Sequence, residues 1–98
     1  LLKSIPQVNH AYHLYPILLP KEIDRDKFIA NMRHCGIGLQ VHYGLVHIHP
    51  YYVFEGYTDS TPIADDFSAR VVSLPIFPDL TDDEQAYVVE SLRKFINE

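Results

Sequence analysis

Apolar residues recur at helical spacing between two residues that suit the ends of a helix. Phe28, Met32 and Cys35 follow one another at steps of four and three residues, which places them on one helical face. Asp24 suits the N-cap because its carboxylate can accept from free amides of the first turn. Gly36 suits the end because glycine adopts a positive φ without strain. The pattern predicts a helix between Asp24 and Gly36, with Cys35 as a small buried apolar residue.

Two further helices are predicted towards the C-terminus. Thr61 and Pro62 combine a capping hydroxyl with a proline at the first helical position, where its missing N–H costs nothing. Thr81 and Glu84 have the spacing of a capping box, in which side chain and backbone bond reciprocally. The predicted apolar faces consist of Ile63, Ala64, Phe67 and Val71, and of Val88, Val89, Leu92, Phe95 and Ile96.

Three segments have the composition of strands. Residues 11–19 are almost continuously aliphatic or aromatic, which is typical of a strand covered on both faces. Pro16 favours an edge position there, because it has no N–H for a central ladder. Residues 38–43 alternate between apolar and polar side chains, and residues 73–77 form a short, mostly apolar segment punctuated by Pro75 and ended by Pro78. The order of elements predicts an α+β two-layer sandwich, with helices on one face of a small, mostly antiparallel sheet.

The connection over residues 44–60 is rich in aromatic residues and histidine. Long connections without secondary structure are uncommon in compact domains and are often functional. With His42, the pair His47 and His49 has the spacing H-x4-H-x-H, which could form an open zinc site or supply one acid–base histidine. Alternatively, His42 completes a sheet face and the other two line the loop. No serine or cysteine nucleophile accompanies them.

Composition restricts the class of protein further. The 98 residues carry 8 basic and 13 acidic side chains, a net charge of −5, which disfavours a broad nucleic-acid-binding face. No stretch approaches the roughly 20 apolar residues that span a bilayer. A single cysteine forbids an internal disulfide and fits a cytoplasmic protein. The length suits one domain.

Other polar residues have structural explanations. Asp65 and Asp66 fall in the first turn of a predicted helix, where the helix dipole favours negative charge. His13 lies among apolar residues, and we expect it to be a hydrogen-bonded core or interface histidine.

An ordered set of short motifs resembles the DegT/DnrJ/StrS family of pyridoxal-phosphate-dependent sugar aminotransferases. The motifs run from about residue 9 to residue 95, nearly the whole chain. They are His10-Ala11-Tyr12-His13-Leu14-Tyr15, Gly36-Ile37, Val41-His42-Tyr43, Val46-His47, Pro50-Tyr51-Tyr52, Ala64-Asp65, Ser73-Leu74-Pro75-Ile76-Phe77-Pro78 and the threonine-capped terminal helix at Thr81.

The resemblance implies that residues 1–98 are the C-terminal small domain of a larger enzyme. In this family a large domain binds pyridoxal phosphate, and a small α+β domain closes over it. The enzymes transfer an amino group, usually from glutamate, to a keto sugar carried on a nucleotide, and their active sites lie at a homodimer interface. The resemblance therefore implies a cytoplasmic role in cell-surface polysaccharide synthesis, with the chain alone inactive. The alternative is a stand-alone binding module of the same fold for a small molecule or a protein.

The resemblance also assigns residues. No lysine matches the family's Schiff-base lysine, so catalytic and cofactor-binding residues are expected outside this chain; its lysines are Lys3, Lys21, Lys27 and Lys94. The loop that approaches the sugar nucleotide matches residues 42–47, which makes Tyr43 and His47 the candidate substrate contacts. Leu45 departs from the family, which often has proline there. Core packing of Tyr43 and a loop-anchoring bond of His47 are the alternatives. As part of a larger enzyme, the chain should expose a patch near Tyr43, Tyr51 and Tyr52.

Overall fold

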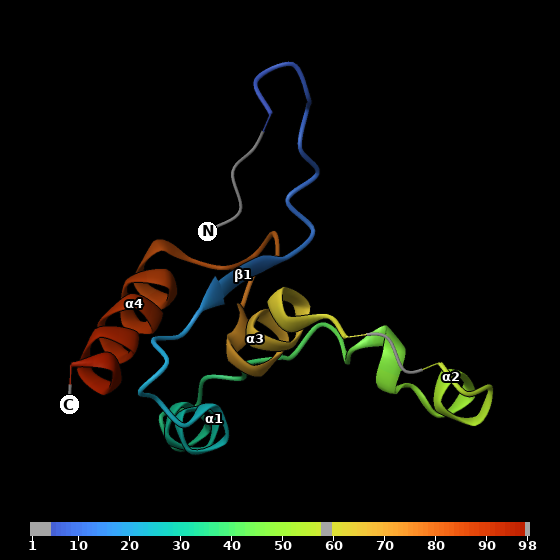
Figure 1. Ribbon diagram of the computed structural model, residues 1–98. Helices are drawn as coiled ribbons and strands as arrows, with labels where there is room; N and C mark the ends of the chain where they lie inside the picture. The colour runs from blue at the N-terminus through green and yellow to red at the C-terminus, as the bar shows by residue number, and fades with distance from the viewer. Residues whose placement is uncertain (1–4, 58–59, 98) are drawn as a thin grey trace.

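A computed structural model describes residues 5–57 and 60–97 (Figure 1). It confirms the α+β class, with helices and a two-stranded antiparallel sheet. In chain order the elements are β1 (Tyr15–Leu18), α1 (Arg25–His34), the 3₁₀ helix η1 (Val46–Ile48), α2 (Pro50–Phe54), α3 (Pro62–Arg70), β2 (Val71–Leu74) and α4 (Asp82–Ile96).

The sheet joins the start of the chain to its last third. β1 and β2 run antiparallel, with Tyr15 opposite Leu74 and Pro16 opposite Ser73. On its other side, Ser73 bonds the backbone of Gln40, since Ser73 N donates to Gln40 O over 2.7 Å and Gln40 N donates to Ser73 O over 3.2 Å. Pro16 therefore lies on an outer strand, as predicted. It needs no ladder bond, because the amide and carbonyl of Ser73 point away from it.

The strand predicted over residues 38–43 is wrong, since this segment forms only the bridge between Gln40 and Ser73. In register, the next bonded pair would be His42 with Val71. Val71 N instead donates to Phe67 O as the last bond of α3, and Val71 O faces Arg25 Nη1 at 3.5 Å. Both backbone groups of Val71 are thus engaged elsewhere, and the ladder stops after one pair.

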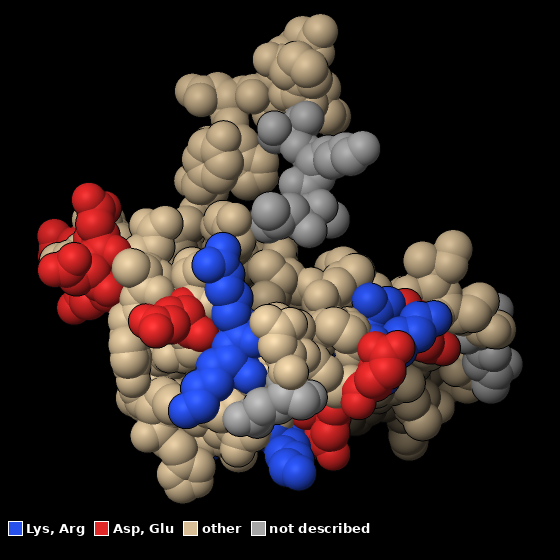
Figure 2. Space-filling model, turned by 90° about the vertical axis from the view of Figure 1, so that its left-hand side faces the viewer, with Lys and Arg blue, Asp and Glu red and all other residues tan. Residues whose placement is uncertain are grey.

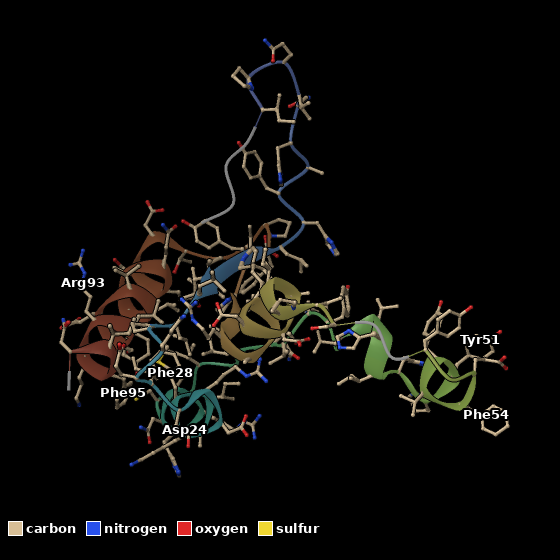
Figure 3. All side chains as sticks on the ribbon, in the orientation of Figure 1. Asp24, Phe28, Tyr51, Phe54, Arg93 and Phe95 are labelled. Carbon is tan, nitrogen blue, oxygen red and sulfur yellow. The ribbon has the colours of Figure 1, made fainter. Side chains whose placement is uncertain are left out.

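The hydrophobic core lies between one face of the sheet and the helices α1 and α4. Phe28 and Met32 of the predicted α1 stripe are buried in it, as are Val88 and Leu92 of the predicted α4 face, and Phe95 and Ile96 pack against it. Val89, also predicted on that face, is instead 37% exposed. Phe28 from α1 and Phe95 from α4 meet edge to face, with ring centroids 6.5 Å apart (Figure 3). Cys35 is only partly buried, contrary to expectation, because it occupies the C-cap of α1. The buried cluster consists of Leu19, Phe28, Met32, Ile37, Leu39, Val72, Val88 and Leu92.

Helix ends agree with the sequence at α1 and α4 but not at α3. Asp24 caps α1 by accepting from Lys27 N at 3.1 Å, and Gly36 follows the helix with a φ of 78°. Thr81 and Glu84 form both bonds of the capping box. Thr61 stands at the N-cap of α3, yet its side chain makes no capping bond. The predicted capping role of its hydroxyl is therefore wrong.

Two segments extend away from this core: residues 5–14, and residues 44–57, called the aromatic arm below (Figure 1). They raise the radius of gyration to 15.8 Å, where a compact chain of this length has about 13 Å. The strand predicted over 11–19 shrinks to Tyr15–Leu18, because β2 ends at Leu74 and offers no partner further on. His13 is consequently exposed, and the expected core role is wrong. The aromatic arm contains η1 and α2, so it is not without structure.

On the side of the molecule that bears α4, Lys and Arg side chains lie interspersed with Asp and Glu among uncharged surface (Figure 2). Charges of both signs partly cancel there, so this face presents no extended field of one sign. Within residues 5–57 and 60–97, no helix has the length and apolar character needed to cross a membrane.

Candidate functional site

An open groove of about 980 Å³ lies between the aromatic arm and α3. It contains both predicted substrate contacts, Tyr43 and His47, which the fold brings to one site. Its lining is mostly apolar, as in small-molecule sites that orient a ligand with a few polar groups. The lining residues are His42, Tyr43, Gly44, Leu45, Val46, His47, Tyr52, Tyr57, Thr61, Pro62, Ile63, Ala64, Phe67, Ser68 and Val71.

Tyr43 directly precedes the aromatic arm and lines the groove. It is 68% exposed, so core packing does not explain its position. Its ring lies edge to face on His42, with centroids 5.0 Å apart. His42 is in turn held by Ser73, whose Oγ lies 3.0 Å from His42 Nδ1. Because Ser73 is a buried residue of β2, this contact connects the orientation of Tyr43 to the sheet.

His47 belongs to η1, and its side chain faces the start of α3. Its Nε2 is 3.2 Å from Asp65 Oδ1, and its Nδ1 is 3.2 Å from Thr61 Oγ1. The side chain is 26% exposed. The loop-anchoring hydrogen bond considered from the sequence is therefore present, and one edge of the ring still borders the groove.

His49 has a third, local role. It is the N-cap of α2, and its Nδ1 accepts from Tyr51 N over 3.3 Å. The three histidines of the H-x4-H-x-H pattern thus contact different partners. Across the described ranges, no group of three or more His, Cys, Asp or Glu side chains is placed to hold a metal ion, so the zinc alternative gains no support there.

The aromatic arm exposes its large side chains. Tyr52 lies edge to face with Tyr51 and Tyr57, at centroid distances of 5.2 Å and 5.6 Å. Tyr43, Tyr51 and Tyr52 are all exposed, which confirms the predicted patch. Tyr51 and Phe54 belong to α2, at the end of the arm away from the core (Figure 3), and Phe54 is 89% exposed. A surface this apolar is typical of a protein interface.

The structure adds Thr61 and Asp65 to the residues singled out from the sequence. Both had sufficient explanations as parts of a helix start, so the sequence contained no separate indication of their contact with His47. Asp66, the next residue, has different partners: Arg70 Nη1 at 2.7 Å and Lys21 Nζ at 3.8 Å. The two adjacent carboxylates therefore serve different sides of α3.

The lysines of the described chain do not suit a Schiff base with a cofactor in this groove. Lys21 pairs with Asp66, Lys94 lies 5.6 Å from the centroid of the Phe95 ring, and Lys27 follows the cap of α1. None of these lysines lines the groove. Lys3 lies outside the described residues.

The α+β fold thus combines an apolar groove with a projecting aromatic arm whose large side chains are exposed. The sequence matches the DegT/DnrJ/EryC1/StrS aminotransferase family over residues 2–93. The chain belongs to this family.

Proteins of known sequence and structure support this family assignment. The chain is 38% identical over 96 residues to the uncharacterized protein MJ1066 of Methanocaldococcus jannaschii, covering 93% of this chain and 25% of that protein. It is 34% identical over 94 residues to the spore coat polysaccharide biosynthesis protein SpsC of Bacillus subtilis, covering 90% and 24%. The fold matches the structure of S. venezuelae DesV in complex with a ketimine intermediate with a TM-score of 0.83 at 26% identity, covering 98% and 26%. The chain thus spans about a quarter of the length of these relatives.

Proposed function

We propose that this chain is the C-terminal small domain of a pyridoxal-phosphate-dependent aminotransferase that acts on a keto sugar carried on a nucleotide. The observation that carries the proposal is the groove beside the aromatic arm, which holds Tyr43 and His47 together. Membership of the aminotransferase family supplies the reaction class. The coverage of about a quarter of each relative supports a longer polypeptide that contains the cofactor site.

In this proposal the chain binds and orients the sugar nucleotide. Tyr43 offers an exposed ring for stacking and a hydroxyl for a hydrogen bond. Both ring nitrogens of His47 face Thr61 and Asp65, so in this proposal His47 contacts the substrate with the rest of its ring, which borders the groove. The apolar lining formed by residues such as Val46, Ala64 and Phe67 excludes water around these polar contacts. The amino donor is glutamate, and the cofactor and its lysine belong to the rest of the polypeptide.

The exposed apolar side chains support the proposal that other parts of the larger protein cover this surface. Phe54 is 89% and Ile63 is 86% exposed, so both leave most of their apolar surface open to solvent. We propose that the large domain and a second subunit cover this surface in a homodimer. The chain alone is then inactive. Its relationship to SpsC supports a role in cell-surface polysaccharide synthesis, and we place this role in the cytoplasm.

The test uses the whole polypeptide and this chain side by side. The whole polypeptide should transfer the amino group of glutamate to a keto sugar nucleotide, and the 98-residue chain should not. Tyr43→Ala should raise the KM for the sugar nucleotide about tenfold, the factor expected for losing one good contact. Tyr43→Phe keeps the ring and should have a smaller effect. Absence of transfer by the whole polypeptide, or transfer by the chain alone, would contradict the proposal.

A stand-alone binding module is the second candidate, favoured by the fact that the groove is formed within this chain. Under this alternative the chain alone binds a nucleotide sugar in a calorimetric titration. Under the aminotransferase proposal the groove is only part of a larger site, so the isolated chain shows little or no heat of binding. Saturable binding by the chain together with an inactive whole polypeptide would replace the first proposal by the second.

A further inference from the structure

The start of α3 lacks the side-chain capping bond that its sequence predicts. A threonine at the N-cap normally accepts a hydrogen bond from an amide two or three residues further on. Here the Thr61 hydroxyl donates to Asp65 Oδ1 over 3.1 Å and faces the ring of His47, at 3.2 Å from Nδ1 and 3.5 Å from Nε2. A local rule that is broken without local compensation is expected at functional sites.

Asp65 completes a triangle of side chains with Thr61 and His47. The same oxygen that accepts from Thr61, Asp65 Oδ1, lies 3.2 Å from His47 Nε2. A carboxylate oxygen can only accept, so His47 Nε2 must donate to it. The imidazole ring is thereby held by two side chains at the start of α3.

This triangle also joins the aromatic arm to the rest of the molecule. In the described part of the chain, the hydrogen bonds and ion pairs that connect residues 44–57 to residues outside the arm are those of His47 with Thr61 and Asp65. The other bonds of the arm are internal, such as Tyr57 N to Tyr52 O. The position of the arm over the groove therefore depends on His47 and its two partners.

We propose that Asp65, assisted by Thr61, is a positioning residue of the groove: it holds the His47 ring and with it the aromatic arm at the distance from α3 that the substrate requires. The inference rests on the proposed function, because it assumes that the groove binds the sugar nucleotide. Asp65 is not among the residues that line the groove. It acts through His47 and touches no substrate.

The test compares Asp65→Asn with Asp66→Asn in the whole polypeptide. Both variants remove one carboxylate from the same turn of α3, but Asp66 pairs with Arg70 and Lys21 on another side. The first measurement is the ¹⁵N chemical shift of the His47 ring nitrogens in protein labelled at histidine. The second is the KM for the sugar nucleotide against kcat. Asp65→Asn should shift the ring resonances and raise KM about tenfold while kcat changes less than about twofold; Asp66→Asn should leave both readouts at the parent values.

A second pair of variants isolates the hydroxyl. Thr61→Val keeps the shape of the side chain and removes its hydrogen bonds, whereas Thr61→Ser restores them. The ring resonances should therefore shift in Thr61→Val and return in Thr61→Ser. Parent-like ring resonances in Asp65→Asn would overturn the proposal, and so would shifted resonances with an unchanged KM. If the unmodified polypeptide transfers no amino group, the proposed function fails, while the ring resonances still decide whether Asp65 holds His47.

Discussion

Arg70 and Leu19 exchange two hydrogen bonds across the junction of α3 with the sheet. Leu19 N donates to Arg70 O over 3.0 Å, and Arg70 Nε donates to Leu19 O over 2.8 Å. Leu19 is fully buried, so its carbonyl has no access to water as a substitute. This pair connects the end of β1 to the end of α3 and so fixes one wall of the groove relative to the core.

We expect Arg70→Ala to destabilise the chain. The substitution leaves the buried Leu19 carbonyl without its side-chain donor and removes the contact with Asp66. A buried carbonyl that loses its donor costs about 1–3 kcal/mol of unfolding free energy. Urea unfolding followed by circular dichroism measures the loss. Arg93→Ala on the exposed surface of α4 is the control, and an equal loss in both variants would contradict the role given to Arg70.

The core of α1 offers a second test. Met32 is fully buried between α1 and the sheet. Met32→Ala therefore removes packing contacts that solvent does not replace. We expect a loss of about 2–5 kcal/mol in unfolding free energy. Met32→Leu conserves volume and should lose less than about 1.5 kcal/mol. If the alanine variant were as stable as the parent, α1 would not pack as described.

The capping box of α4 offers a third test. Thr81 Oγ1 accepts from Glu84 N over 3.2 Å, and Glu84 Oε2 accepts from Thr81 N over 3.0 Å. Thr81→Ala should lower the unfolding free energy by about 1 kcal/mol, while Thr81→Ser keeps the bond and most of the stability. Both variants are measured in the same urea titration. An equal loss in the serine and alanine variants would show that the methyl group, and not the cap, matters.

We expect a substitution in the aromatic arm to change the self-association of the chain but not its unfolding free energy. Since Phe54 is 89% exposed, Phe54→Ser should change the unfolding free energy of the chain by no more than about 0.5 kcal/mol. It should reduce self-association in sedimentation velocity, because an apolar side chain leaves the surface. In the whole polypeptide, where we propose that this surface is covered, the same substitution should destabilise. Equal effects in the two proteins would argue against a covered arm.

The local predictions that succeeded are those in which neighbouring residues in the sequence suffice. Asp24 finds the Lys27 amide three residues away, and Glu84 finds Thr81 at the same spacing. The buried stripe of α1 follows from helical periodicity, and Pro16 indicates an outer strand by its missing donor. These features depend on backbone geometry over one or two turns, which the sequence encodes directly.

The predictions that failed depend on residues far along the chain. Alternation over residues 38–43 favoured a strand, but both backbone groups of Val71 are used by Phe67 and Arg25. His13 looked like a core residue because its neighbours are apolar, yet β2 is too short to pair with it. A sequence pattern indicates that a segment could form a strand. It does not show whether a partner strand has backbone groups available for pairing.

The sequence by itself determined the α+β class, the buried faces and caps of α1 and α4, and the resemblance to the aminotransferase family, because periodicity, capping and ordered motifs are properties of short segments. Only the tertiary structure decided that Tyr43 and His47 share a groove, that the Thr61 hydroxyl contacts Asp65 and His47 instead of capping the helix, and that Asp65 lies 3.2 Å from the His47 ring. Residues 47 and 65 meet because the aromatic arm folds back towards the start of α3, and a contact of this kind is fixed by the path of the chain between them.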